Sequence, residues 1–156
     1  MSGSGGMAGV LEPASVTAAD RFRVLLVEDD PAHAMVIRRA FEEHGRAHGE
    51  PVELTHCDHA EAAIEHLLAS RGPDLVVLDL KLRGTHGIEV LQRIKSEPRL
   101  RGTPVVVLST SSSEQDRALA FRHQACGYIE KPERLDGFRA MASMLLGFWS
   151  RRRGMG

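Results

Sequence analysis

The sequence contains few cysteines, no excess charge of one sign and no long apolar run. Its two cysteines, Cys57 and Cys126, are too few for a disulfide framework or a zinc motif, which favours a reducing, cytoplasmic compartment. Lysine and arginine number 20 against 21 aspartate and glutamate, so the net charge of -1 gives no sign of a nucleic-acid partner. No apolar segment approaches the roughly 18 residues that span a bilayer, so we expect no membrane role.

Several nucleotide and metal motifs are also missing. Neither G-x-x-x-x-G-K-[ST] nor G-x-G-x-x-G occurs, and the eight histidines show no zinc spacing such as H-E-x-x-H. Residues 1–20 are rich in glycine and serine and lack a basic region before an apolar stretch, so we interpret them as a flexible leader. We expect one domain over residues 21–150 and a solvated tail over residues 151–156, with three arginines too few to indicate nucleic-acid or membrane binding.

Strand-like and helix-like segments alternate after the leader. The predicted strands are residues 23–27, 52–56, 74–80, 104–109 and 127–130. The predicted helices are residues 32–44, 60–70, 87–96, 113–124 and 135–149. The runs LVVL and VVVL are apolar throughout, as is typical of strands buried on both faces of a parallel sheet. The pattern therefore predicts an α/β fold with helices on both sides of that sheet.

Polar side chains follow four of the predicted strands. They are Glu28 to Asp30, Asp79, Ser109 with Thr110, and Lys131. Parallel strands bring these ends to one edge, where ligands of open α/β sheets bind. Clustered carboxylates repel one another unless a cation lies between them, and a set of oxygen ligands favours Mg²⁺. An aspartate beside this metal and a lysine is a plausible nucleophile toward a phosphoryl group.

Plainer interpretations exist for each of these residues. An aspartate before the proline at position 31 is a good helix cap, and Asp30 fits that role better than Glu28 or Asp29. Ser109 and Thr110 compete for the hydroxyl role. We interpret His33 as a solvated helix residue rather than a ligand.

The combination of VEDD, LVVLDL, PVVVLST and GYIEKP resembles the receiver domains of two-component response regulators. This resemblance implies a flavodoxin-like (βα)5 fold, a doubly wound parallel sheet with strand order 2-1-3-4-5 in one domain. It also implies that Asp79 is the phosphoacceptor and that the donor is a histidine kinase. The chain would then be a phosphorelay protein and no enzyme beyond its own phosphotransfer and dephosphorylation.

The resemblance also assigns roles to the other strand-end residues. Asp29 and Asp79 would bind Mg²⁺ directly, Glu28 would assist through water, and the backbone carbonyl of Lys81 would be a further ligand. Ser109, chosen over Thr110 by its distance from Pro104, would hydrogen-bond the phosphoryl group, and Lys131 would pair with it. Tyr128 matches an aromatic switch position, although it is also interpretable as an ordinary core aromatic. The family further implies a cis peptide between Lys131 and Pro132.

Two positions depart from the usual family pattern. Arg83 replaces a common proline, which predicts a freer loop after Asp79. Lys81 replaces a common asparagine or methionine, so its ammonium group is within plausible reach of the phosphoryl oxygens. An aspartyl-phosphate phosphatase is a competing function, but such enzymes carry a second aspartate where this chain has Lys81. A pseudo-receiver, the third alternative, predicts the loss of an acidic or lysine position, and none is lost here.

The phrases LLVEDDPA, IKSEP and PVVVLSTS and the pair Phe148-Trp149 resemble, more narrowly, the small receivers paired with bacterial phytochrome kinases. That resemblance implies a homodimer and no output domain. The last predicted helix has a core stripe of Leu135, Phe138, Ala142 and Leu145, which leaves Met141, Met144, Phe148 and Trp149 beyond it. We therefore predict a dimer interface at Phe148 and Trp149. The alternative is that Trp149 folds back onto the edge of the sheet.

Overall fold

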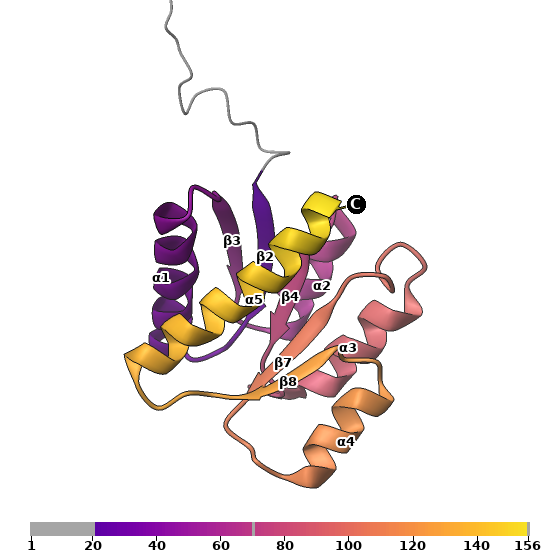
Figure 1. Cartoon of the computed structure of the whole chain (residues 1–156). Helices are drawn as coiled ribbons and strands as arrows, with labels where there is room; N and C mark the ends of the chain where they lie inside the picture. Colours follow the sequence, from indigo (N-terminus) through magenta and orange to yellow (C-terminus); the bar gives the residue numbers. More distant parts are fainter. Residues whose placement is uncertain (1–20, 70, 156) are drawn as a thin grey trace, which may run out of the picture.

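The computed structural model describes residues 21–69 and 71–155, and the predicted leader over residues 1–20 lies outside them. A five-stranded parallel sheet forms the centre of the molecule (Figure 1). In sheet order its strands are β3 (Val52–Cys57), β2 (Phe22–Val27), β4 (Leu75–Leu78), β7 (Val105–Ser109) and β8 (Gly127–Glu130). Counted along the chain without the small hairpin described below, this is the predicted order 2-1-3-4-5 in a single domain.

In the described part of the chain, five helices cover the two faces of the sheet. They are α1 (Pro31–Ala47), α2 (Ala60–Ala69), α3 (Gly87–Ser96), α4 (Glu114–Arg122) and α5 (Leu135–Met155). Helices α1 and α5 pack on one face, and α2, α3 and α4 pack on the other. None of the described helices combines the length and the apolar character needed to cross a membrane.

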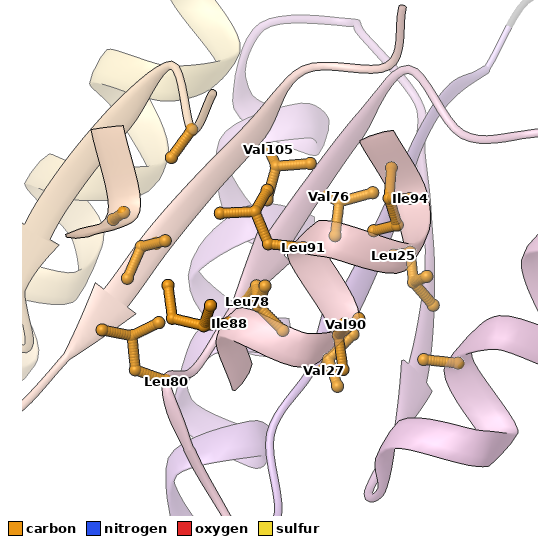
Figure 2. Packing of buried hydrophobic residues seen from close by; sticks show 14 of the residues in the cluster. Leu25, Val27, Val76, Leu78, Leu80, Ile88, Val90, Leu91, Ile94 and Val105 are labelled. Atoms are coloured by element: carbon orange, nitrogen blue, oxygen red, sulfur yellow. The ribbon is translucent and has the colours of Figure 1, made fainter. Parts of the chain in front are cut away.

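Alternation along the strands creates two separate hydrophobic clusters. On β7, Val105 and Val107 belong to the cluster beneath α2, α3 and α4, whereas Val106 and Leu108 belong to the cluster beneath α1 and α5. Figure 2 shows the first cluster, in which Ile88, Leu91 and Ile94 of α3 lie against strand residues such as Val76 and Leu78. All residues of β4 and β7 are buried, as expected for strands covered on both faces.

Helix α1 continues to Ala47, past the predicted end at residue 44. Gly45 lies inside the helix and is buried. A β-carbon there would lie 2.5 Å from the carbonyl oxygen of Glu50 and 3.0 Å from a methyl group of Val52. Gly45 therefore allows the segment that leads into β3 to approach the helix closely, and it does not end the helix.

The last helix differs from its prediction in length and in its buried face. Helix α5 runs beyond Trp149 to Met155, so the predicted tail contains helix. Leu135, expected on the core stripe, is 47% exposed, whereas Met141, expected outside it, is only 4% exposed. Trp149 is half-buried and packs against the cluster of α1 and α5.

Candidate functional site: the acidic cleft at the carboxyl edge of the sheet

Three carboxylates meet where two neighbouring strands end. Glu28 and Asp29 follow β2, and Asp79 follows the neighbouring strand β4. The backbone N–H of Asp79 donates to the carbonyl oxygen of Val27 at 3.0 Å. One carboxylate oxygen from each of the three residues lies within 4.8 Å of the others. Glu28 and Asp79 are buried and Asp29 is half-buried, so this cluster has little solvent to screen its mutual repulsion.

Lys131 enters the same cleft from the end of β8. Its backbone N–H donates to the carbonyl oxygen of Ser109 at 2.8 Å, which ties the segment after β8 to the end of β7. Its ammonium nitrogen lies 2.9 Å from Oδ2 of Asp79 and 2.6 Å from Oε1 of Glu28. The side chain is 5% exposed, so a nearly dry ammonium group faces two carboxylates.

The environment of the cleft shifts two ionisation equilibria. Burial raises the pKa of Glu28, and the negative charge of Asp79 raises it further, against the opposing effect of Lys131. Burial lowers the pKa of Lys131, but its hydrogen bonds to Glu28 and Asp79 outweigh this effect, and the net shift is upward. Lys131 is therefore positively charged at neutral pH and compensates part of the negative charge of the cluster.

The cluster has the donor chemistry of a hard divalent cation. Among the described residues, the buried Oε1 of Glu28 has one partner, the ammonium group of Lys131 at 2.6 Å. The donors of Glu28, Asp29 and Asp79 are all oxygens, which favours Mg²⁺ or Mn²⁺ over zinc. The residues therefore fit a divalent metal.

Asp30 has a different role from its neighbours, as predicted. It is the N-cap of α1, and its Oδ1 accepts hydrogen bonds from the N–H groups of Ala32 at 2.9 Å and His33 at 3.3 Å. These bonds use the carboxylate to satisfy the free donors of the first helical turn. Asp30 therefore anchors the helix beside the cleft, and it is not among the three clustered carboxylates.

The loop after Asp79 has regular backbone pairing. It forms a small antiparallel hairpin of β5 (Lys81–Leu82) and β6 (Thr85–His86), with Gly84 in the left-handed region at a φ of 77°. The N–H of Lys81 donates to Oδ1 of Asp79 at 3.0 Å. Hairpin pairing and this hydrogen bond place the segment against the acidic cluster, and the freer loop expected from Arg83 stays a prediction.

Ser109 and Tyr128 belong to neighbouring strands near the cleft. Ser109 ends β7 and is fully buried, and its hydroxyl oxygen accepts a hydrogen bond from the N–H of Ser111 at 3.1 Å. Tyr128 on β8 is 8% exposed, and its hydroxyl donates to the carbonyl oxygen of Ser111 at 2.9 Å. The guanidinium of Arg117 lies 4.9 Å from the centre of the tyrosine ring. Both side chains therefore hold the same segment after β7.

The structure corrects one further expectation near Lys131 and adds a contact there. The peptide between Lys131 and Pro132 is trans and not cis. His33, interpreted from the sequence as a solvated helix residue, has its Nδ1 atom 3.1 Å from the ammonium nitrogen of Lys131. Its place in the first turn of a helix that starts at the edge of the cleft was the signal that could have indicated this contact.

Comparison with known proteins decides the family. The model of the response regulator receiver domain matches residues 24–143. The chain belongs to this family. Receivers are the signalling domains of two-component response regulators, and this one has the parallel sheet and the acidic cluster at the expected strand ends.

Two curated relatives match this receiver over most of their length. It is 37% identical to the probable methanogenesis regulatory protein FilR2 of Methanothrix harundinacea, covering 85% of this chain and 86% of that protein. It is 32% identical to the response regulator Rcp1 of Synechocystis, covering 81% of this chain and 87% of that protein. The match to the transcriptional activator PfeR of Pseudomonas aeruginosa, at 34% identity, covers 80% of this chain but only 37% of that protein.

Solved structures give the same result. The phosphorylated cyanobacterial phytochrome response regulator RcpA superposes with a TM-score of 0.75 at 32% identity, covering 83% of this receiver and 94% of that chain. The Mn²⁺-bound form of Rcp1 superposes with a TM-score of 0.72 at 31% identity, covering 81% of this receiver and 93% of that chain. The acidic cluster of this receiver is consistent with divalent-metal binding of the kind seen in that structure.

Proposed function

We propose that this receiver accepts a phosphoryl group from a histidine kinase on Asp79 and transmits the signal through protein–protein contacts. The observation that carries the proposal is the position of the Asp79 carboxylate, between a buried lysine at 2.9 Å and the other two acidic residues. A buried carboxylate beside a fixed cation, within a group of oxygen donors suited to a divalent metal, is suited to attack a negatively charged phosphoryl group.

The proposed transfer uses an oxygen of Asp79 as the nucleophile. This oxygen forms a bond to phosphorus while the bond from phosphorus to the imidazole nitrogen of the kinase breaks. The electron pair of the broken bond stays on that nitrogen, which takes a proton from solvent. The product is an acyl phosphate, and Lys131 is placed to pair with the charge on its oxygens. Beyond this transfer and the later hydrolysis of the acyl phosphate, we propose no enzymatic activity.

We propose Mg²⁺ as the metal of the acidic cluster. Asp29 and Asp79 would bind the ion directly, Glu28 would assist through water, and the backbone carbonyl of Lys81 would complete the protein ligands. The hydrogen bond from the Lys81 N–H to Asp79 supports this arrangement because it holds the backbone of Lys81 beside the cluster. When bound, the ion supplies positive charge that stabilises the phosphoryl oxygens during transfer.

Phosphorylation by a small donor tests the site. Acetyl phosphate with Mg²⁺ should add one phosphoryl group to the wild type, as measured by intact-mass spectrometry. The Asp79→Asn variant should stay unmodified, while the matched variant Asp116→Asn, in the first turn of α4 and outside the three clustered carboxylates, should be labelled like the wild type. Equal labelling of Asp79→Asn and the wild type would show that the phosphoacceptor is a different residue.

We further propose that Ser109 and Tyr128 form the switch. A phosphoryl group on Asp79 would attract the Ser109 hydroxyl, which now accepts a hydrogen bond from Ser111. Tyr128 is bound to the carbonyl of that same residue, so movement of this segment would release the tyrosine hydroxyl. Beryllofluoride, a phosphoryl mimic, should therefore change the NMR shifts of the Tyr128 ring, and unchanged shifts would remove Tyr128 from the mechanism.

The phytochrome type of histidine kinase is the proposed partner, in the cytoplasm, where Cys57 and Cys126 would stay reduced. A groove of about 610 Å³ between α1 and the start of α5 opens beside Lys131 and has the exposed side chains of Met35 and Leu135 on its walls. Such a groove next to the acceptor is suited to a helix of the kinase. The similarity to the cyanobacterial phytochrome response regulator RcpA supports the choice of partner.

We also propose a homodimer with Phe148 and Trp149 in its interface. The two rings contact each other with centroids 4.7 Å apart, and Phe148 is 45% exposed. Met144, one turn earlier on α5, is 56% exposed, so an apolar strip extends along the helix. Light scattering should give a dimer mass for the wild type and a monomer mass for Phe148→Ala/Trp149→Ala. A wild type that stays monomeric at hundreds of micromolar with beryllofluoride would exclude this dimer.

A further inference from the structure

The ammonium group of Lys131 has a third neighbour besides the two carboxylates. Nδ1 of His33 lies 3.1 Å from the lysine nitrogen, next to Oε1 of Glu28 at 2.6 Å and Oδ2 of Asp79 at 2.9 Å. The lysine side chain is 5% exposed, whereas that of His33 is 39% exposed. His33 therefore lies between the ammonium group and the solvent.

The chemistry of the contact fixes the tautomer of the histidine. Lys131 lies between two carboxylates, so it carries its proton, and an ammonium group can only donate. Nδ1 of His33 must then accept, which leaves the imidazole neutral with its proton on Nε2. The ammonium group has three protons and three acceptors around it, two charged and one neutral.

The backbone holds His33 in this position. Its N–H donates to Oδ1 of Asp30 at 3.3 Å as part of the cap of α1, so the residue belongs to the ordered first turn. Oδ2 of Asp30 lies 3.5 Å from the same Nδ1 atom and would pair with a protonated imidazole. The neutral form is the one that binds Lys131, since a protonated ring would place two cations side by side.

We propose that His33 is a positioning residue for phosphotransfer. Its neutral imidazole accepts a hydrogen bond from the Lys131 ammonium group and so holds that group beside Asp79. The inference rests on the proposed function of Asp79. A neutral acceptor restricts the orientation of the ammonium group. A third carboxylate would do the same, but its negative charge would compete with the phosphoryl group for the positive charge of Lys131.

Substitutions at position 33 separate this role from a general effect on the helix. Asparagine places its side-chain oxygen as many bonds from the backbone as Nδ1, so His33→Asn should keep the contact and the rate of phosphorylation. Leucine is similar in size but has no acceptor, so His33→Leu should be phosphorylated by acetyl phosphate and Mg²⁺ about three- to tenfold more slowly. His66→Leu, in the last turn of α2, removes an imidazole far from this edge of the sheet and should match the wild type.

A spectroscopic measurement on the unmodified wild type tests the contact without any variant. Long-range ¹H–¹⁵N spectra at mildly alkaline pH should show an unprotonated Nδ1 in His33, and beryllofluoride should shift that signal as Lys131 turns toward the mimic. A proton on Nδ1, or a signal that does not respond to beryllofluoride, would overturn the inference.

The outcomes distinguish the two proposals. If the wild type takes up no phosphoryl group, the proposed function fails, and the inference fails with it. If the wild type is phosphorylated but His33→Leu reacts at the same rate, or if His33→Asn is as slow as His33→Leu, only the role of His33 is wrong. A fall in melting temperature with unchanged rates would assign His33 to helix stability alone and would also overturn the inference.

Discussion

Replacing Gly87 by alanine should destabilise this receiver, although alanine is the better helix former. Gly87 is the first residue of α3, and its backbone is outside the left-handed region, so its conformation does not require glycine. Helix propensity alone would favour alanine by up to about 1 kcal/mol. A β-carbon at this position, however, would lie 2.7 Å from Cα of Leu80 and closer still to the carbonyl oxygen of Asp79.

The magnitude follows from the kind of atoms that would clash. Both neighbours are backbone atoms, which cannot rotate away, and the N–H of Gly87 already donates to the carbonyl oxygen of Leu80 at 2.6 Å. Overpacking of this kind costs about 1–3 kcal/mol. We therefore expect the free energy of unfolding of Gly87→Ala to fall by about 1–3 kcal/mol in urea titrations followed by circular dichroism.

Gly147 provides the matched control because it also lies in a helix. A β-carbon on Gly147 would meet no atom within 4 Å, so Gly147→Ala should leave stability unchanged or raise it by up to about 1 kcal/mol. If Gly87→Ala is as stable as the wild type while Gly147→Ala gains stability, the steric argument at position 87 is refuted. Since the displaced atoms include the backbone of Asp79, we expect Gly87→Ala also to slow phosphorylation of that residue.

Three further predictions concern caps and thiols. Ser113→Ala removes the side-chain acceptor for two N–H groups of α4 and should cost about 1 kcal/mol in urea titrations; an unchanged midpoint would contradict the cap. Hydrogen bonds from the first-turn N–H groups of α1 lower the pKa of Asp30, so its contribution to stability is present above about pH 4 and is lost as pH falls through the folded-state pKa. The difference in stability between wild type and Asp30→Ala should therefore shrink on acidification, and a constant difference would contradict this reasoning. Burial raises the pKa of Cys57, so iodoacetamide should modify exposed Cys126 first in peptide mass spectra, and equal rates would count against the burial of Cys57.

The two central strands are the elements that the sequence predicts most directly. The apolar runs LVVL and VVVL became β4 and β7, and every residue of both strands is buried. The prediction extended the first of these strands through Leu80, whereas the ladder with β7 ends at Leu78. The predicted strand was too long because an apolar run indicates buried residues and not strand pairing. Leu80 is fully buried but does not belong to the sheet.

Helix ends and faces were harder to predict because they depend on contacts made elsewhere. Glycine is typical of a helix end, but Gly45 lies within α1, where its missing side chain allows the segment after the helix to pack closely. On α5, the buried face is set by contact with α1 as well as with the sheet, which brings Met141 into the core. Leu135, at the start of α5, lines the groove with α1 instead.

The candidate site was predictable to the extent that strand order determines it. Parallel strands place Glu28, Asp29, Asp79 and Lys131 at one edge, and the structure brings their side chains together there. The hairpin after Asp79 has no hydrophobic alternation to reveal it, since its pairing covers only four residues. The contact between His33 and Lys131 joins residues 98 apart in sequence, so the place of His33 in the first turn of α1 indicates the edge of the sheet but does not identify the partner.

The division of the interior into two clusters bears on how this protein can be re-engineered. Successive residues of β7 face opposite layers, so the sheet separates the buried side chains of the two layers. Substitutions in the layer of α1 and α5 should then combine additively with substitutions in the layer of α2, α3 and α4, because their buried side chains belong to separate clusters. A designer could thus replace the α1–α5 surface to recruit a new partner while leaving the opposite layer as found. The residues that need joint optimisation are those at the carboxyl edge, where both layers meet the acidic cleft.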